Sequence, residues 1–244
     1  IGTTDKEFTG KPEAVSIDDW EVGYLLKVYN HHFKTTVSET DIVSTYSGIR
    51  PLCDDESLDP SAITRDYTLE LQCQSPENAL ISIYGGKITT YRKLAEATLL
   101  KLKPFLPGKM QSWTADSPLP GAKKFGQSLD EIKFLINKEH PWLDSKQLER
   151  YSKSYGLMCL GFLEGKQFPE ALGINFGFDL YQAEIDYLIE NEWACKAEDI
   201  LWRRTKLGLF FNDEQVKQVE LYIKDKMGIN VTTEIAKEIE PLAV

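Results

Sequence analysis

The sequence predicts an α+β first part followed by an all-helical domain, and three observations support this prediction. Residues 67–73 and 79–84 are two short runs of β-forming residues, and apolar residues at helical spacing follow them. Prolines and glycines are concentrated between 104 and 127, which is typical of a linker and places a domain boundary near residue 121. Beyond that point, capping residues and helical apolar spacing recur as far as residue 228.

Composition limits the classes of function. The chain has 244 residues, of which 38 are acidic and 28 basic, and the resulting net charge of −10 argues against nucleic-acid binding. With 42% hydrophobic residues the chain can form a substantial core, but it has no run of 18 apolar residues that could cross a membrane. The four cysteines form no C-x-x-C pair, which favours a reduced intracellular protein. The chain starts at Ile1 in a strand-like run, which indicates a piece of a longer polypeptide.

The first part alternates predicted strands and helices. A helix is expected between 16 and 33, where apolar residues recur at helical spacing. Gly85 and Gly86 end the second of the two strands named above, and another helix is expected from Ile88 to just before Pro104. The other expected elements are a strand at 1–9, a turn or helix start at 38–41, a short strand at 45–49, an acidic surface loop at 54–60 and a turn at 74–78.

The second part has helix signals throughout. Ser128 with Glu131 makes a capping box, and Asp144 with Gln147 makes a weaker one. The helices that begin at these caps are expected to end at Pro141 and Gly156, and further helices are expected at 179–192, at 197–207 and in a last stretch ending at Gly228. No internal repeat is visible, so this part is expected to be one compact helical domain.

Arginines are few and unevenly placed. There are six against 22 lysines, and three of the six, Arg50, Arg65 and Arg92, lie between positions 50 and 92. Because a guanidinium grips phosphate or carboxylate at two points, Arg50 and Arg65 beside a cleft would suit a small anionic substrate. The alternative is that each arginine pairs with a nearby surface acid.

The stretch from Gly85 to Thr90 is a second candidate site. A helix N-terminus has unpaired N–H groups and a partial positive charge, so it favours anions. The two glycines would let a flat or charged ligand approach the backbone, and Lys87 adds a full positive charge. Such a turn would stabilise the negative N1–C2=O2 edge of a reduced flavin. The alternative is an ordinary turn that only ends a strand.

Other reactive side chains are interpreted as structural. Capping or solvation explains His31, His32 and His140, which lie near predicted helix ends. The segment 53–56 contains Cys and three acids but has no complementary metal ligands at a useful spacing. In the run 202–204, the tryptophan is expected to be a core aromatic flanked by two charged arginines.

Five ordered motifs resemble the FAD-dependent glycerol-3-phosphate dehydrogenases, most closely their aerobic, respiratory bacterial branch. The similarity is collinear and covers nearly the whole chain. The motifs are IGTTD at 1–5, YSGIRPL at 46–52, ITRDY at 63–67, GGKITTYRKLA at 85–95 and EDILWRRTK at 198–206.

This resemblance implies an enzyme that transfers a hydride from C2 of sn-glycerol 3-phosphate to FAD and passes the electrons to ubiquinone. It implies that Arg50 binds the substrate beside the flavin and that Arg65 holds or orients the substrate phosphate. Arg50 and Lys87 are the implied catalytic residues. The implied cofactor-binding residues are Gly85, Gly86 and Lys87 at the flavin and substrate, with Ile88, Thr89 and Thr90 along the flavin edge.

The resemblance also divides the chain. Residues 1–42 would belong to a substrate-binding subdomain, 43–103 to the C-terminal part of the FAD-binding domain, 104–121 to a linker and 122–244 to a helical C-terminal domain. The family holds the ADP half of FAD with an N-terminal G-x-G-x-x-G unit, which this sequence lacks. We therefore expect the chain alone to be inactive, to bind FAD poorly and to need the N-terminal half of the same enzyme as a partner.

Membrane contact and oligomerisation are further implications. The family attaches peripherally to the cytoplasmic face of the inner membrane, and the basic and aromatic residues between Lys101 and Lys124 are a candidate surface, with a solvated linker as the alternative. The helical domain is a candidate for homodimerisation. Two other functions stay open: a glycerol-3-phosphate oxidase that uses oxygen, and a non-catalytic helical interaction module that retains the motifs.

Overall fold

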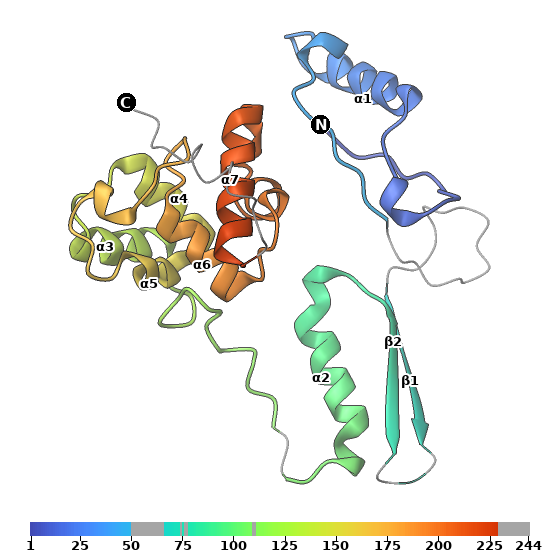
Figure 1. Ribbon diagram of the computed structural model, residues 1–244. Coiled ribbons are helices and arrows are strands. Elements are labelled where there is room, and N and C mark those ends of the chain that lie inside the picture. The colour runs from blue at the N-terminus through green and yellow to red at the C-terminus, as the bar shows by residue number, and fades with distance from the viewer. Residues whose placement is uncertain (50–65, 74, 76–77, 109–110, 229–244) are drawn as a thin grey trace. The chain divides into compact units, whose positions relative to one another are not determined.

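The computed structural model describes residues 1–49, 66–73, 75, 78–108 and 111–228 (Figure 1). It divides into two compact units, residues 1–115 and 116–244, and the division falls inside the proline-rich segment. The helices and strands are α1 (Asp19–His32), β1 (Tyr67–Cys73), β2 (Ala79–Gly85), α2 (Tyr91–Leu102), α3 (Leu129–Glu139), α4 (Ser145–Tyr155), α5 (Cys159–Leu163), α6 (Gln182–Glu192) and α7 (Asp213–Lys226). The predicted fold class, strands with helices followed by an all-helical part, is confirmed.

Shorter helical segments connect these elements. The 3-10 helices are Pro12–Ala14, Glu39–Asp41, Ile88–Thr90, Lys103–Phe105, Gly156–Met158, Pro169–Leu172 and Leu207–Leu209. A π-helical segment covers Asp199–Arg204.

The helix predicted between 16 and 33 is confirmed as α1. Its N-terminus is a capping box: Glu21 N–H donates to the Asp18 carboxylate at 2.9 Å, and Asp18 N–H donates to the Glu21 carboxylate at 3.1 Å. The Trp20 and Tyr24 rings stack with centroids 5.6 Å apart and lie largely in solvent. Within the described part of the first unit, this aromatic face of α1 is therefore largely uncovered.

Two strand predictions for the first unit are wrong. Residues 1–9 and 45–49 are extended or irregular but form no strand. A strand persists only when its backbone groups pair with a neighbouring strand, and in the described part of the sheet β1 and β2 pair only with each other. The loop predicted at 54–60 lies outside the described residues.

The hairpin predicted around residues 74–78 is confirmed. β1 and β2 are antiparallel, with Tyr67 opposite Gly85 and Cys73 opposite Ala79. α2 lies beside both strands (Figure 1), and the Lys101 ammonium donates to the Leu69 carbonyl oxygen at 2.7 Å. No described residue of the first unit is buried, since its hairpin and its helices α1 and α2 offer too little apolar area for a core.

The second unit contains the whole core of the described chain. Helices α3 to α7 surround side chains such as Ile136, Leu163, Leu188 and Ile200, each with no solvent exposure. The capping box at Ser128 is confirmed, and Glu131 N–H donates to Ser128 Oγ at 3.2 Å. Asp144 is confirmed as the N-cap of α4, where its carboxylate accepts the Lys146 and Gln147 N–H groups, but no capping box with the Gln147 side chain is formed. This unit has the packing of a self-contained helical domain.

Three expectations for the second unit need correction. The helix expected at 197–207 is mainly a π-helix, and Thr205 N–H donates to the Ile200 carbonyl five residues back at 3.0 Å. Trp202 is 38% exposed and is not a core residue. His140 does follow the last turn of α3, but it is buried rather than solvated and meets the Trp142 ring edge-on at 5.9 Å.

Gly156 is expected to tolerate no side chain. It ends α4 at φ 56°, and an added Cβ would collide with the Gly121 carbonyl, which already accepts the Leu157 N–H at 2.8 Å. Gly156→Ala should therefore lower the free energy of unfolding of the second unit by about 2–4 kcal/mol. Chemical denaturation followed by far-UV circular dichroism measures this loss.

Gly161→Ala is the matched control, because a Cβ at this helical glycine meets no atom within 4 Å. It should leave stability unchanged or raise it by ~0.5–1 kcal/mol, since alanine is the better helix former. Equal stability of the two variants would contradict the close packing of Gly121 on Gly156.

Candidate functional site

The structure describes six of the eight predicted site residues. Arg50 and Arg65 lie outside the described residues. The remaining six, Gly85 to Thr90, form one continuous turn that connects β2 to α2. This turn is the candidate site within the described residues.

The two glycines reverse the chain after β2. Gly85 has φ 70° and Gly86 has φ 105°, and both values lie in the region that side chains disfavour. A Cβ on Gly86 would stand 3.4 Å from Tyr67 Cβ and 3.7 Å from Leu94 Cδ2. The glycines therefore let the chain turn from β2 into α2 while Gly86 lies close to Tyr67 and Leu94, and this structural role needs no ligand.

The turn after the glycines is a 3-10 helix rather than the first turn of the α-helix. Thr90 N–H and its hydroxyl both donate to the Lys87 carbonyl, at 3.0 and 2.9 Å, and α2 proper begins at Tyr91. The side chains of the two N-cap residues, Lys87 and Thr90, make no capping hydrogen bond to these segments. Backbone N–H groups of the turn thus remain available to an anion.

The surroundings of Lys87 combine one cation with apolar surface. Lys87 and Thr89 are exposed, Ile88 is 87% exposed, and Tyr91 is 53% exposed. Apolar side chains left open beside an anion-binding turn suit a flat ligand that carries charge on one edge. In the described structure this lysine and these apolar side chains are open to solvent.

The third arginine of the cluster is not available to a ligand. Arg92 pairs with Glu96 at 2.7 Å, and Lys93 reaches the other oxygen of that carboxylate at 3.1 Å. Ser112 and Thr114 also donate to Glu96. The Ser112 hydroxyl is the main cause that lowers the pKa of Glu96 to about 2, so this carboxylate stays ionised and keeps Arg92.

A buried polar cluster in the second unit has no counterpart in the sequence prediction. The Arg150 guanidinium binds both oxygens of Glu184, with Nη2 2.7 Å from Oε2, and also donates to the Asp179 carbonyl at 2.7 Å. The Tyr155 hydroxyl donates to Glu184 at 2.6 Å. Burial and the nearby Glu184 charge raise the pKa of Tyr155. Because these groups are committed to one another, we interpret the cluster as structural.

Metal ligation and a reactive buried thiol were two further possibilities in the described part of the chain. It contains no group of three or more His, Cys, Asp or Glu placed to hold a metal ion. Burial raises the pKa of the Cys159 thiol to about 12, so this thiol is inert at neutral pH.

The chain is similar to glycerol-3-phosphate dehydrogenases and to a domain of a related oxidase. Residues 112–228 match the family described as the C-terminal domain of alpha-glycerophosphate oxidase. The chain is 46% identical over 226 residues to a glycerol-3-phosphate dehydrogenase of Pseudomonas aeruginosa, covering 93% of this chain and 44% of that protein. It is 45% identical over 223 residues to the aerobic glycerol-3-phosphate dehydrogenase of Escherichia coli, covering 91% and 44%.

A relative with another name is also similar. The D-erythritol 1-phosphate dehydrogenase of Brucella abortus is 39% identical over 215 residues, covering 88% of this chain and 43% of that protein. The chain spans less than half the length of the curated relatives it matches. These matches confirm the resemblance that the five motifs indicate.

Proposed function

We propose that this chain contributes to the FAD-dependent oxidation of sn-glycerol 3-phosphate to dihydroxyacetone phosphate. The premise is that the chain corresponds to the C-terminal part of the glycerol-3-phosphate dehydrogenases. The observation that carries the proposal is the uncapped turn from Gly85 to Thr90, which presents a lysine and backbone N–H groups beside apolar surface. This turn lies inside the motif at 85–95 that resembles the family.

Each predicted residue has a role in this proposal. Lys87 and the turn that follows it would hold negative charge on the flavin edge and on the substrate. Ile88, Thr89 and Thr90 would lie along the flavin edge. Arg50 would bind the substrate beside the flavin, and Arg65 would hold or orient the substrate phosphate. FAD, when bound, supplies the hydride acceptor. With the cofactor bound, the positive charge of Lys87 would stabilise negative charge on the flavin edge.

The site needs further polypeptide. The first unit has no buried residue among those described, so its hairpin and helix must pack on other protein to exclude water from the reacting atoms. The curated relatives are more than twice the length of the region that this chain matches. We therefore propose the N-terminal part of the same enzyme as the partner, and expect the chain alone to be inactive.

Full-length enzyme that includes this chain tests the proposed function. Anaerobic glycerol 3-phosphate should bleach its flavin absorbance, while glycerol without phosphate should not. D-erythritol 1-phosphate should bleach it more slowly, because the chain is less similar to the dehydrogenase named for that substrate. If D-erythritol 1-phosphate bleached the flavin and glycerol 3-phosphate did not, D-erythritol 1-phosphate would be the substrate instead. No bleaching by either compound would refute the dehydrogenase proposal.

Ubiquinone is the proposed electron acceptor, and oxygen is the alternative, as in an oxidase. Turnover of the same enzyme with a short-chain quinone should exceed turnover with oxygen as the acceptor.

A homodimer is a further proposed state, which analytical ultracentrifugation of the full-length enzyme measures. A monomer at micromolar concentration would contradict it.

Peripheral contact with the membrane is a further proposal. In the part of the chain that the structure describes, no helix is long and apolar enough to cross a membrane. Near the end of α2, Lys103 is exposed, Leu106 is 39% exposed and Trp113 is 72% exposed, a mixture that suits a lipid surface. Lys101→Glu with Lys103→Glu should weaken binding of the full-length enzyme to anionic liposomes several-fold. Unchanged binding would refute this surface.

A further inference from the structure

We propose that Trp193 is the central contact of a docking surface on the second unit. Its partner is the further polypeptide that the curated relatives contain outside the region that this chain matches. The inference rests on the proposed function, because that function supplies the partner. It assigns the domain contact to one side chain.

Trp193 combines two unfavourable features. It follows the last residue of α6 with φ 55° and ψ 30°, a left-handed conformation in which glycine or asparagine is usual. A bulky residue in that conformation is strained. Trp193 is 86% exposed, so packing within the described part of the second unit does not offset that strain. Strain combined with exposure indicates a residue kept for contact with something else.

The backbone that follows Trp193 is firmly anchored. Ala194 is 1% exposed and Ala197 is 2% exposed, and Ala194 N–H donates to the Leu188 carbonyl at 3.1 Å. The small side chains on this side of the loop are packed into the domain core. Trp193 is therefore held outward.

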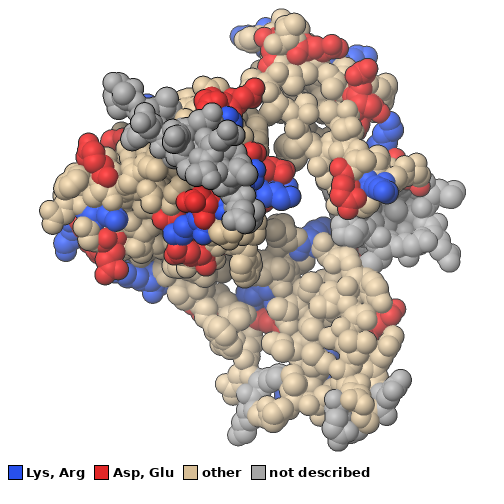
Figure 2. Space-filling view, viewed as in Figure 1, with Lys and Arg blue, Asp and Glu red and all other residues tan. Residues whose placement is uncertain are grey.

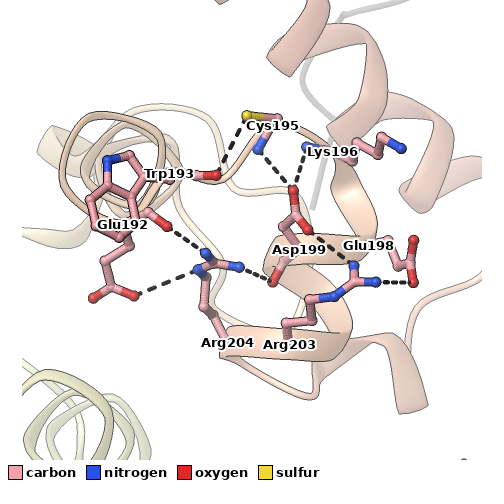
Figure 3. Close-up of polar contacts among 8 residues, drawn as sticks. All are labelled: Glu192, Trp193, Cys195, Lys196, Glu198, Asp199, Arg203 and Arg204. Atoms are coloured by element: carbon pink, nitrogen blue, oxygen red, sulfur yellow. Dashed lines mark hydrogen bonds and ion pairs between the residues drawn. The ribbon is translucent and has the colours of Figure 1, made fainter. Parts of the chain in front are cut away.

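A clamp of arginine and aspartate fixes the same loop (Figure 3). The Arg204 guanidinium donates to the Glu192 carbonyl just before Trp193, and its other amino group donates to the Asp199 carbonyl at 3.4 Å. The Asp199 carboxylate accepts the N–H groups of Cys195 at 2.9 Å and Lys196 at 3.0 Å. A tryptophan on a rigid loop loses little conformational entropy on binding, which is typical of an interface hot spot.

The charges around Trp193 favour a protein partner over a lipid or nucleic-acid surface. Arg204 lies 3.7 Å from the Glu192 carboxylate, and Arg203 pairs with Glu198 at 2.8 Å and with Asp199 at 3.0 Å. Because these charges neutralise one another, the surface has no cationic excess to attract phosphate. It presents an apolar ring within a polar rim, which is the usual anatomy of a protein interface.

Comparison of lengths identifies the partner. The 226 residues matched in the Pseudomonas aeruginosa relative are 44% of that protein, so more than half of it lies outside the match. In a single polypeptide that further part is always present at high effective concentration. That further part is therefore the partner that the exposed Trp193 would meet most often.

Two variants test the proposal in this chain and in full-length enzyme. Trp193→Gly removes the anchor and relieves the left-handed strain, so the melting temperature of this chain should stay the same or rise. In the full-length enzyme, the same change should speed tryptic cleavage of the linker by about tenfold or more, as expected for loss of a hot spot. Phe134→Ala, at a 67% exposed position within α3, is the control and should change neither measurement.

Cys195 provides an independent readout, because it is exposed and lies two residues from Trp193. Its alkylation by iodoacetamide, measured by peptide mass spectrometry, should be at least tenfold slower in full-length enzyme than in this chain. Trp193→Gly should remove most of that protection.

Several outcomes would overturn the proposal. A lower melting temperature of this chain with Trp193→Gly would make Trp193 a structural residue. Equal alkylation of Cys195 in chain and full-length enzyme would place the contact elsewhere. Protection that appears in this chain only on self-association would identify a second copy as the partner, and protection only with vesicles would identify lipid.

One outcome separates this proposal from the proposed function. If Cys195 is protected in full-length enzyme but glycerol 3-phosphate does not bleach the flavin, the proposed function is refuted and the docking surface stands.

Discussion

Replacing Glu184 with alanine is expected to lower the free energy of unfolding of the second unit by about 3–5 kcal/mol, the usual effect of removing one partner of a buried ion pair. The Glu184 side chain has no solvent exposure and that of Arg150 has 18%. Without the carboxylate, the guanidinium would be left largely buried and unpaired, and the Tyr155 hydroxyl would lose its acceptor. Guanidinium chloride unfolding, followed by circular dichroism, measures the loss.

Two comparisons separate the buried pair from ordinary surface charge. Glu190→Ala removes a carboxylate that is 61% exposed and lies 3.4 Å from Lys226, so it should cost only ~0–1 kcal/mol. The double change Arg150→Leu with Glu184→Met should cost much less than Glu184→Ala, because it leaves no buried charge. A Glu184→Ala protein that unfolds at the wild-type midpoint would contradict the structural role of the cluster.

Replacing Lys87 with methionine should lower kcat/KM for glycerol 3-phosphate by about 10²–10³ in full-length enzyme, the range seen when one preorganised electrostatic group is removed from an active site. Methionine keeps the length of the side chain but removes the charge that faces the flavin edge in the proposed site. Stopped-flow measurement of anaerobic flavin bleaching gives the rate of the chemical step directly.

Lys93→Met is the matched control for this prediction. Lys93 is a lysine six positions further along the chain, whose 68% exposed side chain pairs with Glu96 at 3.1 Å. Its loss should change the bleaching rate less than about threefold, because an exposed pair contributes little. Equal effects of the two variants would mean that Lys87 acts through general surface charge rather than at the reacting atoms.

Local signals explain why much of the fold is predictable from the sequence. The capping boxes at Asp18 and Ser128 and the glycines at 85, 86 and 156 are local: each requires only nearby residues to form the element it predicts. The hairpin follows from two strand-forming runs close together in the chain. The same property made the turn from Gly85 to Thr90 recognisable as a candidate anion site.

Long-range pairing explains what the sequence could not show. Residues 1–9 have the composition of a strand, but no described strand pairs with them. Glu184 resembles an ordinary acid in the first turn of a helix, and only the fold brings it to Arg150, which lies 34 residues earlier. Trp193 gives no sequence signal of a left-handed backbone, since glycine or asparagine would be expected there.

The visible absorbance spectrum of the purified chain, before and after addition of the N-terminal part of the enzyme, is the most direct test of the central claim that this chain supplies one side of a flavin site. The account predicts no flavin band with the chain alone, and a band that glycerol 3-phosphate bleaches once the two parts are mixed with FAD. Lys87→Met should reduce that bleaching without changing the spectrum of the chain alone. A stoichiometric flavin band in the chain by itself would contradict the account, because residues 1–244 would then hold the cofactor unaided.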